Sequence, residues 1–412
     1  MGTSIHSCPH CGPDDYLGRE NCTDILVRSR PDVIQEIHES FLRAGADCVE
    51  TDTFGANVLV LGEFDAEAAS WTRELNREAA RIARAACDRY STPERPRFVL
   101  GSMGPGTKLI TLGQVDWDTM HASYLEQARG LLDGGTDAFI IETCQDLLQV
   151  KCAINACLDA LAERGLDAEH VPLFVSVTIE TTGTMLLGSE IEAVVNALKP
   201  FPIASLGLNC ATGPVEMAEH VAYLAKHWDR YVSVVPNAGL PALVDGRTVY
   251  PLEPGAFADA MRRFLDEHRV SLVGGCCGTT PEHIRRLAEV VGDRPQPRRE
   301  IVPQPPGCSS LYGFVEFRQD NSFLIVAERT NANGSRKFKR LLDEESWDGL
   351  VSMAREEMRD GSHLLDVCVD FVGRDGVRDM SEVVSRFVRQ VNAPLMLDST
   401  DPRVIEAGLR RS

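Results

Sequence analysis

Short apolar runs rich in β-branched residues alternate with longer amphipathic stretches along the chain from residue 30 onward. This alternation is typical of repeated strand–helix units that build a parallel sheet. The first part of the chain contains seven predicted strands, at residues 47–51, 97–101, 138–142, 173–178, 204–209, 231–235 and 270–274. Eight predicted helices lie around them, at residues 31–44, 66–89, 117–133, 146–164, 189–199, 214–228, 254–268 and 280–290.

Seven strands with eight helices are one strand short of a (β/α)8 TIM barrel. The first predicted helix has no strand before it, because Met1 opens directly into GTSI. We therefore expect an α/β fold in which the barrel lacks its first strand. The strands on either side of that position would leave backbone groups without partners.

A second α/β pattern follows residues 292–307, which are rich in proline and charge and predict an interdomain linker. Its strands are predicted at residues 323–327, 363–367 and 395–397, and its helices at 346–359, 381–391 and 402–409. Three strand–helix units cannot close a barrel, so we expect an incomplete second barrel. The predicted organisation is a first domain at 1–291, a linker at 292–320 and a partial domain at 321–412.

The charge and the cysteine content narrow the functional classes. A formal net charge of −19 argues against nucleic acid as a partner, since nucleic-acid binders present a clustered basic face. No apolar run is long enough to span a bilayer, and the first residues lack the layout of a signal peptide. We expect a cytoplasmic protein without a membrane partner, in which the 13 cysteines are buried thiols or metal ligands rather than disulfides.

Three cysteines stand at predicted strand ends. Cys210 follows an apolar strand in SLGLNCATGP, and the adjacent Cys276 and Cys277 follow another in GGCCGTTPEH. Carboxyl ends of barrel strands form the active-site face, and the glycines around the cysteine pair permit a sharp turn there. Three thiolates with a fourth position open predict a catalytic zinc site, the alternative being three buried free thiols. The CPHC stretch at residues 8–11 has no second CxxC at a suitable distance and predicts a loop.

These motifs carry a family resemblance. GLNCATGP and GGCCGTTPEHI, with FLRAGADCVETDTFGAN, GGTDAFIIETCQD and VVPNAGLP, resemble the homocysteine-binding domain of the cobalamin-dependent methionine synthases, from Met1 to about Val291. FLIVAERTNANGSRKFKRLL, GSHLLDVCVD and PLMLDST resemble the start of the pterin-binding domain of the same family. The second resemblance favours this family over the betaine and S-methylmethionine homocysteine methyltransferases, which share the cysteine motif.

The resemblance implies roles for individual residues. Cys210, Cys276 and Cys277 match the family's zinc ligands, and Glu142 in IIET matches a carboxylate that holds the homocysteine amino group. Asn237 in PNAG is a candidate substrate contact at the barrel mouth, with bracing of the backbone as an equal alternative. In the second domain, Glu328 and Asp398 match positions that contact the pterin ring.

Two departures from the family pattern are visible. The opening strand that carries a substrate-binding Asp in the family is absent, and Cys368 stands where many relatives have Asn.

The resemblance implies methyl transfer to homocysteine, giving methionine. Zinc deprotonates the substrate thiol, because the thiolate is the nucleophile. The methyl group is expected to come from methylcobalamin, on a module in cis or in trans that these residues do not include, and originally from 5-methyltetrahydrofolate. The alternatives are a homocysteine methyltransferase that uses betaine or S-methylmethionine, and an inactive fragment that binds zinc.

Overall fold

The first part of the chain folds into a curved parallel sheet in the computed structural model, which describes residues 1–244, 246–295 and 298–412. Its seven strands pair in the order β1-β2-β3-β4-β5-β6-β9, and every pairing is parallel. The strands are β1 (Cys48–Glu50), β2 (Phe98–Met103), β3 (Ala138–Cys144), β4 (Leu173–Val177), β5 (Ser205–Asn209), β6 (Tyr231–Val235) and β9 (Leu272–Val273). The seven strands predicted from the sequence are therefore confirmed, with shifts of a few residues at their ends.

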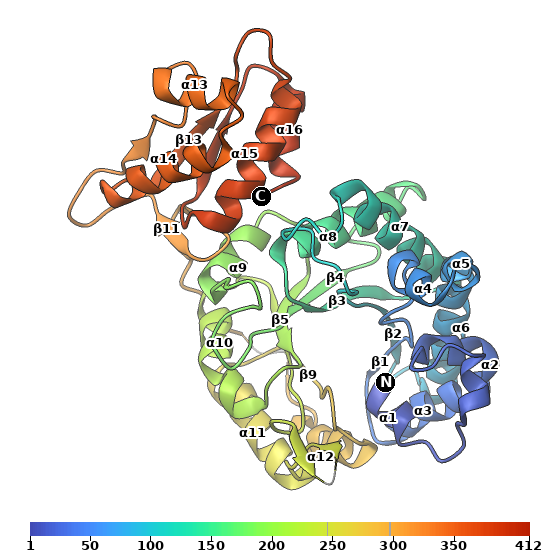
Figure 1. Cartoon of the computed structure of the whole chain (residues 1–412). Helices are drawn as coiled ribbons and strands as arrows, with labels where there is room; N and C mark the ends of the chain where they lie inside the picture. Colours follow the sequence, from blue (N-terminus) through green and yellow to red (C-terminus); the bar gives the residue numbers. More distant parts are fainter. Residues whose placement is uncertain (245, 296–297) are drawn as a thin grey trace.

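Helices cover the outer side of this sheet (Figure 1). The long ones are α3 (Pro31–Arg43), α6 (Thr72–Tyr90), α7 (Trp117–Gly134), α8 (Leu147–Ala162), α9 (Ile191–Leu198), α10 (Pro214–His227), α11 (Pro254–Glu267) and α12 (Pro281–Val291). Polar side chains cap several of them at the N-terminus, as Asp116 does for α7 and Asp146 for α8. The main core lies between helices and strands, around the buried Phe139, Leu206 and Trp228.

The sheet forms a half-barrel rather than a closed ring. β1 and β9 are its two edges, and no pairing joins them within the described residues. Because all strands are parallel, their carboxyl ends lie at one rim, where a (β/α) fold carries its active site. None of the described helices is long and apolar enough to cross a membrane.

The predicted helix at residues 66–89 is wrong as a single element. It is divided into α5 (Ala66–Ser70) and α6, and the break falls at Trp71. The guanidinium groups of Arg19 and Arg28 both stack on the Trp71 ring, so packing of the N-terminal segment accompanies the break.

Several short elements were not predicted. They are α1 (Gly2–His6), α2 (Leu26–Ser29), α4 (Val58–Phe64), α13 (Arg336–Asp343), two 3₁₀ turns (Pro13–Tyr16 and Thr23–Ile25) and the hairpin of β7 (Ala242–Val244) and β8 (Arg247–Val249).

The second α/β unit has a three-stranded parallel sheet, β12-β13-β14. Its elements are β12 (Val326–Ala327), α14 (Trp347–Arg359), β13 (Leu364–Cys368), α15 (Gly376–Gln390), β14 (Leu395–Asp398) and α16 (Pro402–Leu409). The strand order is the predicted one, while α15 begins five residues earlier than expected. The second unit has its own core around Phe338, Leu365 and Phe387.

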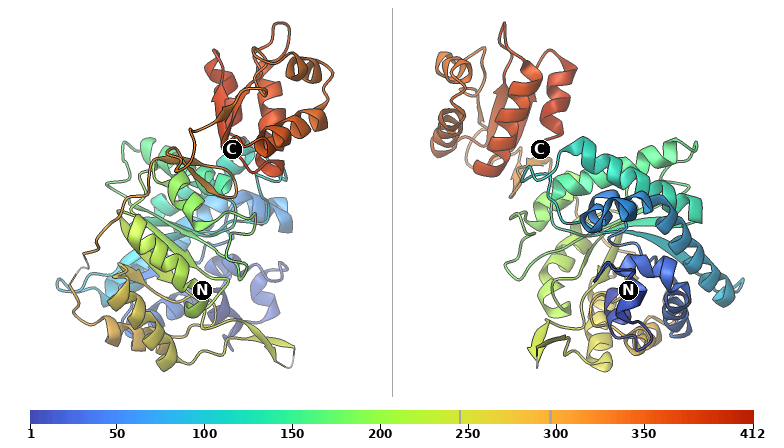
Figure 2. Two further views of the ribbon diagram at one scale, coloured as in Figure 1. Left: turned by 90° about the vertical axis from the view of Figure 1, so that its left-hand side faces the viewer. Right: turned by 45° about the vertical axis from the view of Figure 1, so that its right-hand side comes forward.

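Part of the predicted linker is folded. Residues 296–297 lie outside the described residues, but β10 (Gly307–Ser309) and β11 (Phe314–Glu316) form an antiparallel hairpin. Tyr312, at the tip of this hairpin, joins the two units: its carbonyl accepts the Glu190 N–H at 2.8 Å, and its hydroxyl donates to the Arg389 carbonyl at 2.7 Å. The second unit sits at one end of the first, beyond α8 and α9 (Figures 1 and 2).

Candidate metal and substrate site

Three cysteine sulfurs converge at the rim formed by the carboxyl ends of the strands. Cys210 directly follows β5, and Cys276 and Cys277 follow β9. Their sulfur atoms all lie within 4.8 Å of one another, and Cys210 Sγ is 3.8 Å from Cys277 Sγ. They form the one cluster of three metal-binding side chains found in the described part of the chain. The sequence placed these cysteines at strand ends, and the fold brings them together.

The backbone around the cysteines is held in unusual conformations. Cys210 and Ala211 both lie in the left-handed region, with φ of 60° and 53°, which non-glycine residues rarely adopt. On the other side, Gly278 has a φ of +77° and its Cα faces the Tyr250 side chain so closely that a Cβ would lie 2.3 Å from Tyr250 Cβ. Glycine is therefore required after the cysteine pair.

Asn237 braces the turn that carries the cysteine pair. Its amide oxygen accepts the Cys277 N–H at 3.0 Å, and the Ala238 N–H donates to the Cys277 carbonyl at 2.9 Å. The Cys276 N–H donates in turn to the Pro236 carbonyl at 2.8 Å. The loop after β6 thus fixes the loop after β9. A contact between Asn237 and the substrate remains a prediction.

The sulfur cluster fits a tetrahedral metal ion. Zinc–sulfur bonds of about 2.3 Å at tetrahedral angles place neighbouring sulfurs about 3.8 Å apart, which is the separation of Cys210 Sγ and Cys277 Sγ. The pKa of Cys277 lies well below its ordinary value because the Cys210 and Cys276 thiols donate hydrogen bonds to its sulfur. The pKa of Cys276 is raised, chiefly through its hydrogen bond with Cys210. Three thiolates this close would repel one another, so a cation between the sulfurs would favour the fully ionised cluster.

The Glu142 carboxyl lies at the same rim, near the end of β3. Ser102 Oγ donates to Glu142 Oε1 at 2.5 Å, and Asn209 Nδ2 donates to Oε2 at 3.4 Å. Burial raises the Glu142 pKa to about 8, with smaller contributions from Glu50 and from Cys277, which places the carboxyl within electrostatic range of the cysteines. The free-energy cost of ionising a buried carboxyl of this kind falls when a cationic group of a ligand binds beside it.

Sequence reasoning missed the residues that support this rim. They are Ser102 and Asn209, which hold Glu142, and Tyr250, whose hydroxyl hydrogen-bonds to Cys277. Ser102 and Asn209 stand in or at the end of predicted strands, so the sequence could have indicated their place near the rim. The sequence could not have indicated their hydrogen-bond partners, because those depend on the register between strands.

The second unit places its two predicted site residues at one edge of its sheet. Glu328 is exposed and directly follows β12, and Asp398 is the last residue of β14. Between them, Asn331 Nδ2 donates to Asp366 Oδ2 at 2.9 Å and to Asp398 Oδ2 at 3.4 Å. The thiol of Cys368 accepts from Asn333 Nδ2 at 3.6 Å. Asn331 and Asp366 are polar groups at this edge that sequence reasoning did not single out.

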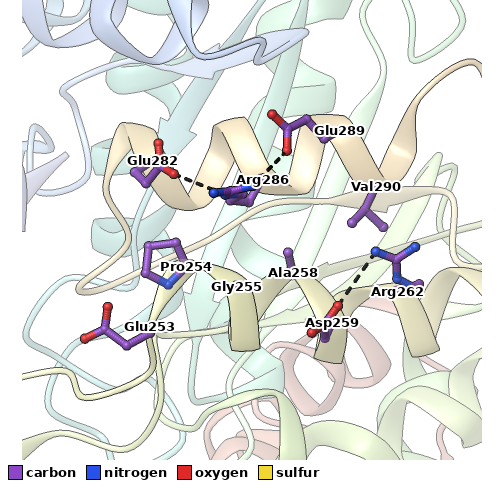
Figure 3. A pocket seen from close by; sticks show the side chains of 10 residues that line it. All are labelled: Glu253, Pro254, Gly255, Ala258, Asp259, Arg262, Glu282, Arg286, Glu289 and Val290. Carbon is purple, nitrogen blue, oxygen red and sulfur yellow. Dashed lines mark hydrogen bonds and ion pairs between the residues drawn. The ribbon is translucent and has the colours of Figure 1, made fainter.

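Surface cavities lie away from these residues. One of about 410 Å³ lies between α11 and α12, and a second of about 550 Å³ between α9 and α10. In the first, Arg286 pairs with Glu282 and Glu289, and Arg262 pairs with Asp259, so both arginines of the lining already have carboxylate partners (Figure 3). Neither cavity is lined by the three cysteines, Glu142 or Asn237.

A half-barrel with three converging cysteine sulfurs at its carboxyl rim defines an α/β protein with a candidate site for a thiolate-bound metal. Comparison with known families gives the particular class. The family described as Homocysteine S-methyltransferase matches residues 1–291, and the family described as Pterin binding enzyme matches residues 327–412. The chain belongs to the homocysteine S-methyltransferase family.

Whole-chain relatives agree with both matches. The chain is 49% identical over 409 residues to the methionine synthase of Mycobacterium tuberculosis (strain ATCC 25618 / H37Rv), and 49% identical over 413 residues to that of Mycobacterium leprae (strain TN). Each alignment covers 99% of this chain and 34% of the relative. The chain thus spans about a third of the length of these relatives.

A solved structure supports the fold. The metallated homocysteine methyltransferase MmuM of Escherichia coli superposes with a TM-score of 0.55, covering 70% of this chain and 93% of that one, at 22% sequence identity. The oxidized form of the same protein gives a TM-score of 0.54. At this identity the likeness concerns the fold of the half-barrel.

Proposed function

We propose that this chain binds zinc through Cys210, Cys276 and Cys277 and takes part in methyl transfer to homocysteine, giving methionine. The observation that supports the proposal most strongly is the sulfur cluster, whose spacing fits a tetrahedral ion and leaves one position free. When bound, zinc would hold the homocysteine sulfur as a thiolate at neutral pH.

The residues of the chain would bind and orient the substrate. The Glu142 carboxyl would bind the substrate ammonium group as a carboxylate, releasing its proton to the solvent as the cation binds. Asn237 holds the Cys277 peptide, and we propose that its side chain also borders the substrate. With the sulfur and the amino group both held, the methyl acceptor would be fixed in one orientation, which reduces the entropy lost in the reaction.

We further propose that the second unit binds the pterin of 5-methyltetrahydrofolate, with Glu328 and Asp398 as contacts. The match of residues 327–412 to pterin binding enzymes supports this and favours folate over betaine or S-methylmethionine as the methyl source. Methylcobalamin would carry the methyl group between the two units, on a module in cis or in trans. We also propose a domain division into residues 1–291 and 321–412. The first domain would be a (β/α)8 barrel without its first strand, and the protein would be cytoplasmic.

Metal analysis with a methyl-transfer assay tests the proposal. The wild-type chain should hold one zinc ion and Cys277→Ala none, while Cys8→Ser should hold one, because Cys8 lies outside the sulfur cluster. With free methylcobalamin and homocysteine, the wild-type chain should form methionine and Cys277→Ala should not. Stoichiometric tight zinc in Cys277→Ala would refute the ligand assignment, and a zinc-loaded chain that forms no methionine would be an inactive zinc-binding fragment.

A further inference from the structure

Asn209 occupies a position that connects the two halves of the candidate site. It is the last residue of β5, directly precedes Cys210, and is 2% exposed. Its side chain reaches past β4 to the end of β3, where it makes three hydrogen bonds. One buried amide therefore links the strand that carries a cysteine with the strand that carries Glu142.

Two of these hydrogen bonds hold a strained turn. Thr143 has a φ of 58°, in the left-handed region that β-branched residues avoid, and the register of β3 shifts between Ile141 and Cys144. Asn209 Oδ1 accepts the Thr143 N–H at 2.9 Å, and Asn209 Nδ2 donates to Thr143 Oγ1 at 2.7 Å. The amide thus stabilises a conformation that the threonine backbone would otherwise leave.

The third hydrogen bond fixes the neighbouring carboxyl. Asn209 Nδ2 donates to Glu142 Oε2 at 3.4 Å, while Ser102 Oγ donates to Oε1 at 2.5 Å. Both carboxyl oxygens are therefore held from opposite sides. An amide is required at position 209, because a carboxylate has no N–H to donate and would place a second negative charge beside Glu142.

We propose that Asn209 is a positioning residue for the amino-acid part of the substrate: it fixes the Glu142 carboxyl relative to Cys210, and so the distance between the ammonium site and the sulfur site. This inference rests on the proposed function, in which Glu142 receives the substrate ammonium group. In this proposal Asn209 acts through Glu142, to which its amide donates, and not by contact with the substrate or the metal. Its effect should appear only for ligands that carry the amino group.

Two thiols of equal length test this. L-homocysteine carries the amino group, and 4-mercaptobutanoate has the same chain without it. In the zinc-loaded full chain, Asn209→Ala should weaken L-homocysteine binding by about 10- to 100-fold, the usual effect of losing a hydrogen bond to a charged group, and change 4-mercaptobutanoate binding by less than about 2-fold. Zinc content should stay at one per chain. Asn155→Ala, which removes a half-buried amide on α8, is the matched control and should change neither affinity.

A second variant covers the case in which Asn209→Ala folds poorly. Thr143→Gly accepts a positive φ without strain, so the double variant Asn209→Ala/Thr143→Gly should recover stability. Its preference for L-homocysteine over 4-mercaptobutanoate should still be weak, because the hydrogen bond to Glu142 is missing.

The possible results distinguish a failure of the Asn209 positioning role from a failure of the proposed function. Equal losses of both thiols in Asn209→Ala, or full recovery of L-homocysteine binding in the double variant, would overturn the positioning role and leave the proposed function intact. A wild-type chain that binds both thiols equally well would instead overturn the role of Glu142, and the inference with it.

Discussion

Gly278→Ala should weaken zinc binding at the candidate metal site. Gly278 follows the cysteine pair with a φ of +77°, and the new Cβ would lie 2.3 Å from Tyr250 Cβ and Cγ and 2.6 Å from Cδ2. Contacts this short require that the tyrosine or the turn move. The Tyr250 hydroxyl hydrogen-bonds to Cys277, so either movement disturbs a proposed ligand.

The expected loss of zinc affinity in Gly278→Ala has two contributions. A left-handed alanine costs about 1–2 kcal/mol, and overpacking against Tyr250 costs about 1–3 kcal/mol more. A total of about 3 kcal/mol expressed at the metal site corresponds to roughly a 100-fold loss of zinc affinity. Competition with a chromophoric chelator measures that affinity, and chemical denaturation of the zinc-free chain measures the part that falls on folding.

Gly165→Ala is the matched control. Gly165 has a similar φ of +68°, but no atom lies within 4 Å of the new Cβ. It should lose only the backbone contribution of about 1–2 kcal/mol and keep its zinc affinity. Tyr250→Gly, which removes the Cβ as well as the ring, should relieve the clash in a double variant with Gly278→Ala. Equal zinc affinities for the Gly278→Ala and Gly165→Ala variants would refute the reasoning about this turn.

Three further results are expected. The Glu142 pKa of about 8 exceeds the ordinary 4.5, so the unfolded chain binds fewer protons than the folded chain between these pH values. The free energy of unfolding should therefore fall as pH rises from about 4.5 to 8. Denaturation curves taken across that range measure the fall, and Glu142→Gln should reduce it. Gly207→Ala should destabilise the sheet by about 3 kcal/mol or more, because its Cβ would lie 1.9 Å from Ser233 Oγ and 2.2 Å from the Ser233 carbonyl oxygen. The control variant Gly255→Ala, whose Cβ would meet no atom within 4 Å, should keep the stability of the unchanged chain. Equal denaturation midpoints for the two variants would contradict this prediction. Asn237→Ala should leave the Cys277 N–H without its acceptor and lower zinc affinity by about 10-fold in the chelator assay, whereas unchanged affinity would remove the bracing role.

The alternation of apolar runs and amphipathic stretches was sufficient to place the strands of the main sheet. A parallel strand is buried on both sides, so its apolar run is nearly continuous and easy to detect, as in LFVSV of β4. The β7–β8 hairpin lacks that signal because all of its described strand residues are exposed. The break at Trp71 coincides with contacts from Arg19 and Arg28, which come from a distant segment.

The candidate site likewise has features that the sequence predicts and features that it does not. Cysteines at strand ends, flanked by glycines, indicate chemistry in the sequence itself. The support of Glu142 does not, because Ser102 reaches it from β2 and Asn209 from β5, across an intervening strand and a register shift in β3. Those contacts are products of sheet curvature and register, which no local pattern of residues specifies.

Zinc X-ray absorption spectroscopy on the purified chain, before and after addition of L-homocysteine, tests the central claim most directly. Three cysteine ligands with one open position predict three sulfur neighbours at about 2.3 Å without the substrate and four with it. Fewer than three sulfur neighbours in the substrate-free chain, or no added sulfur at saturating L-homocysteine, would contradict the account.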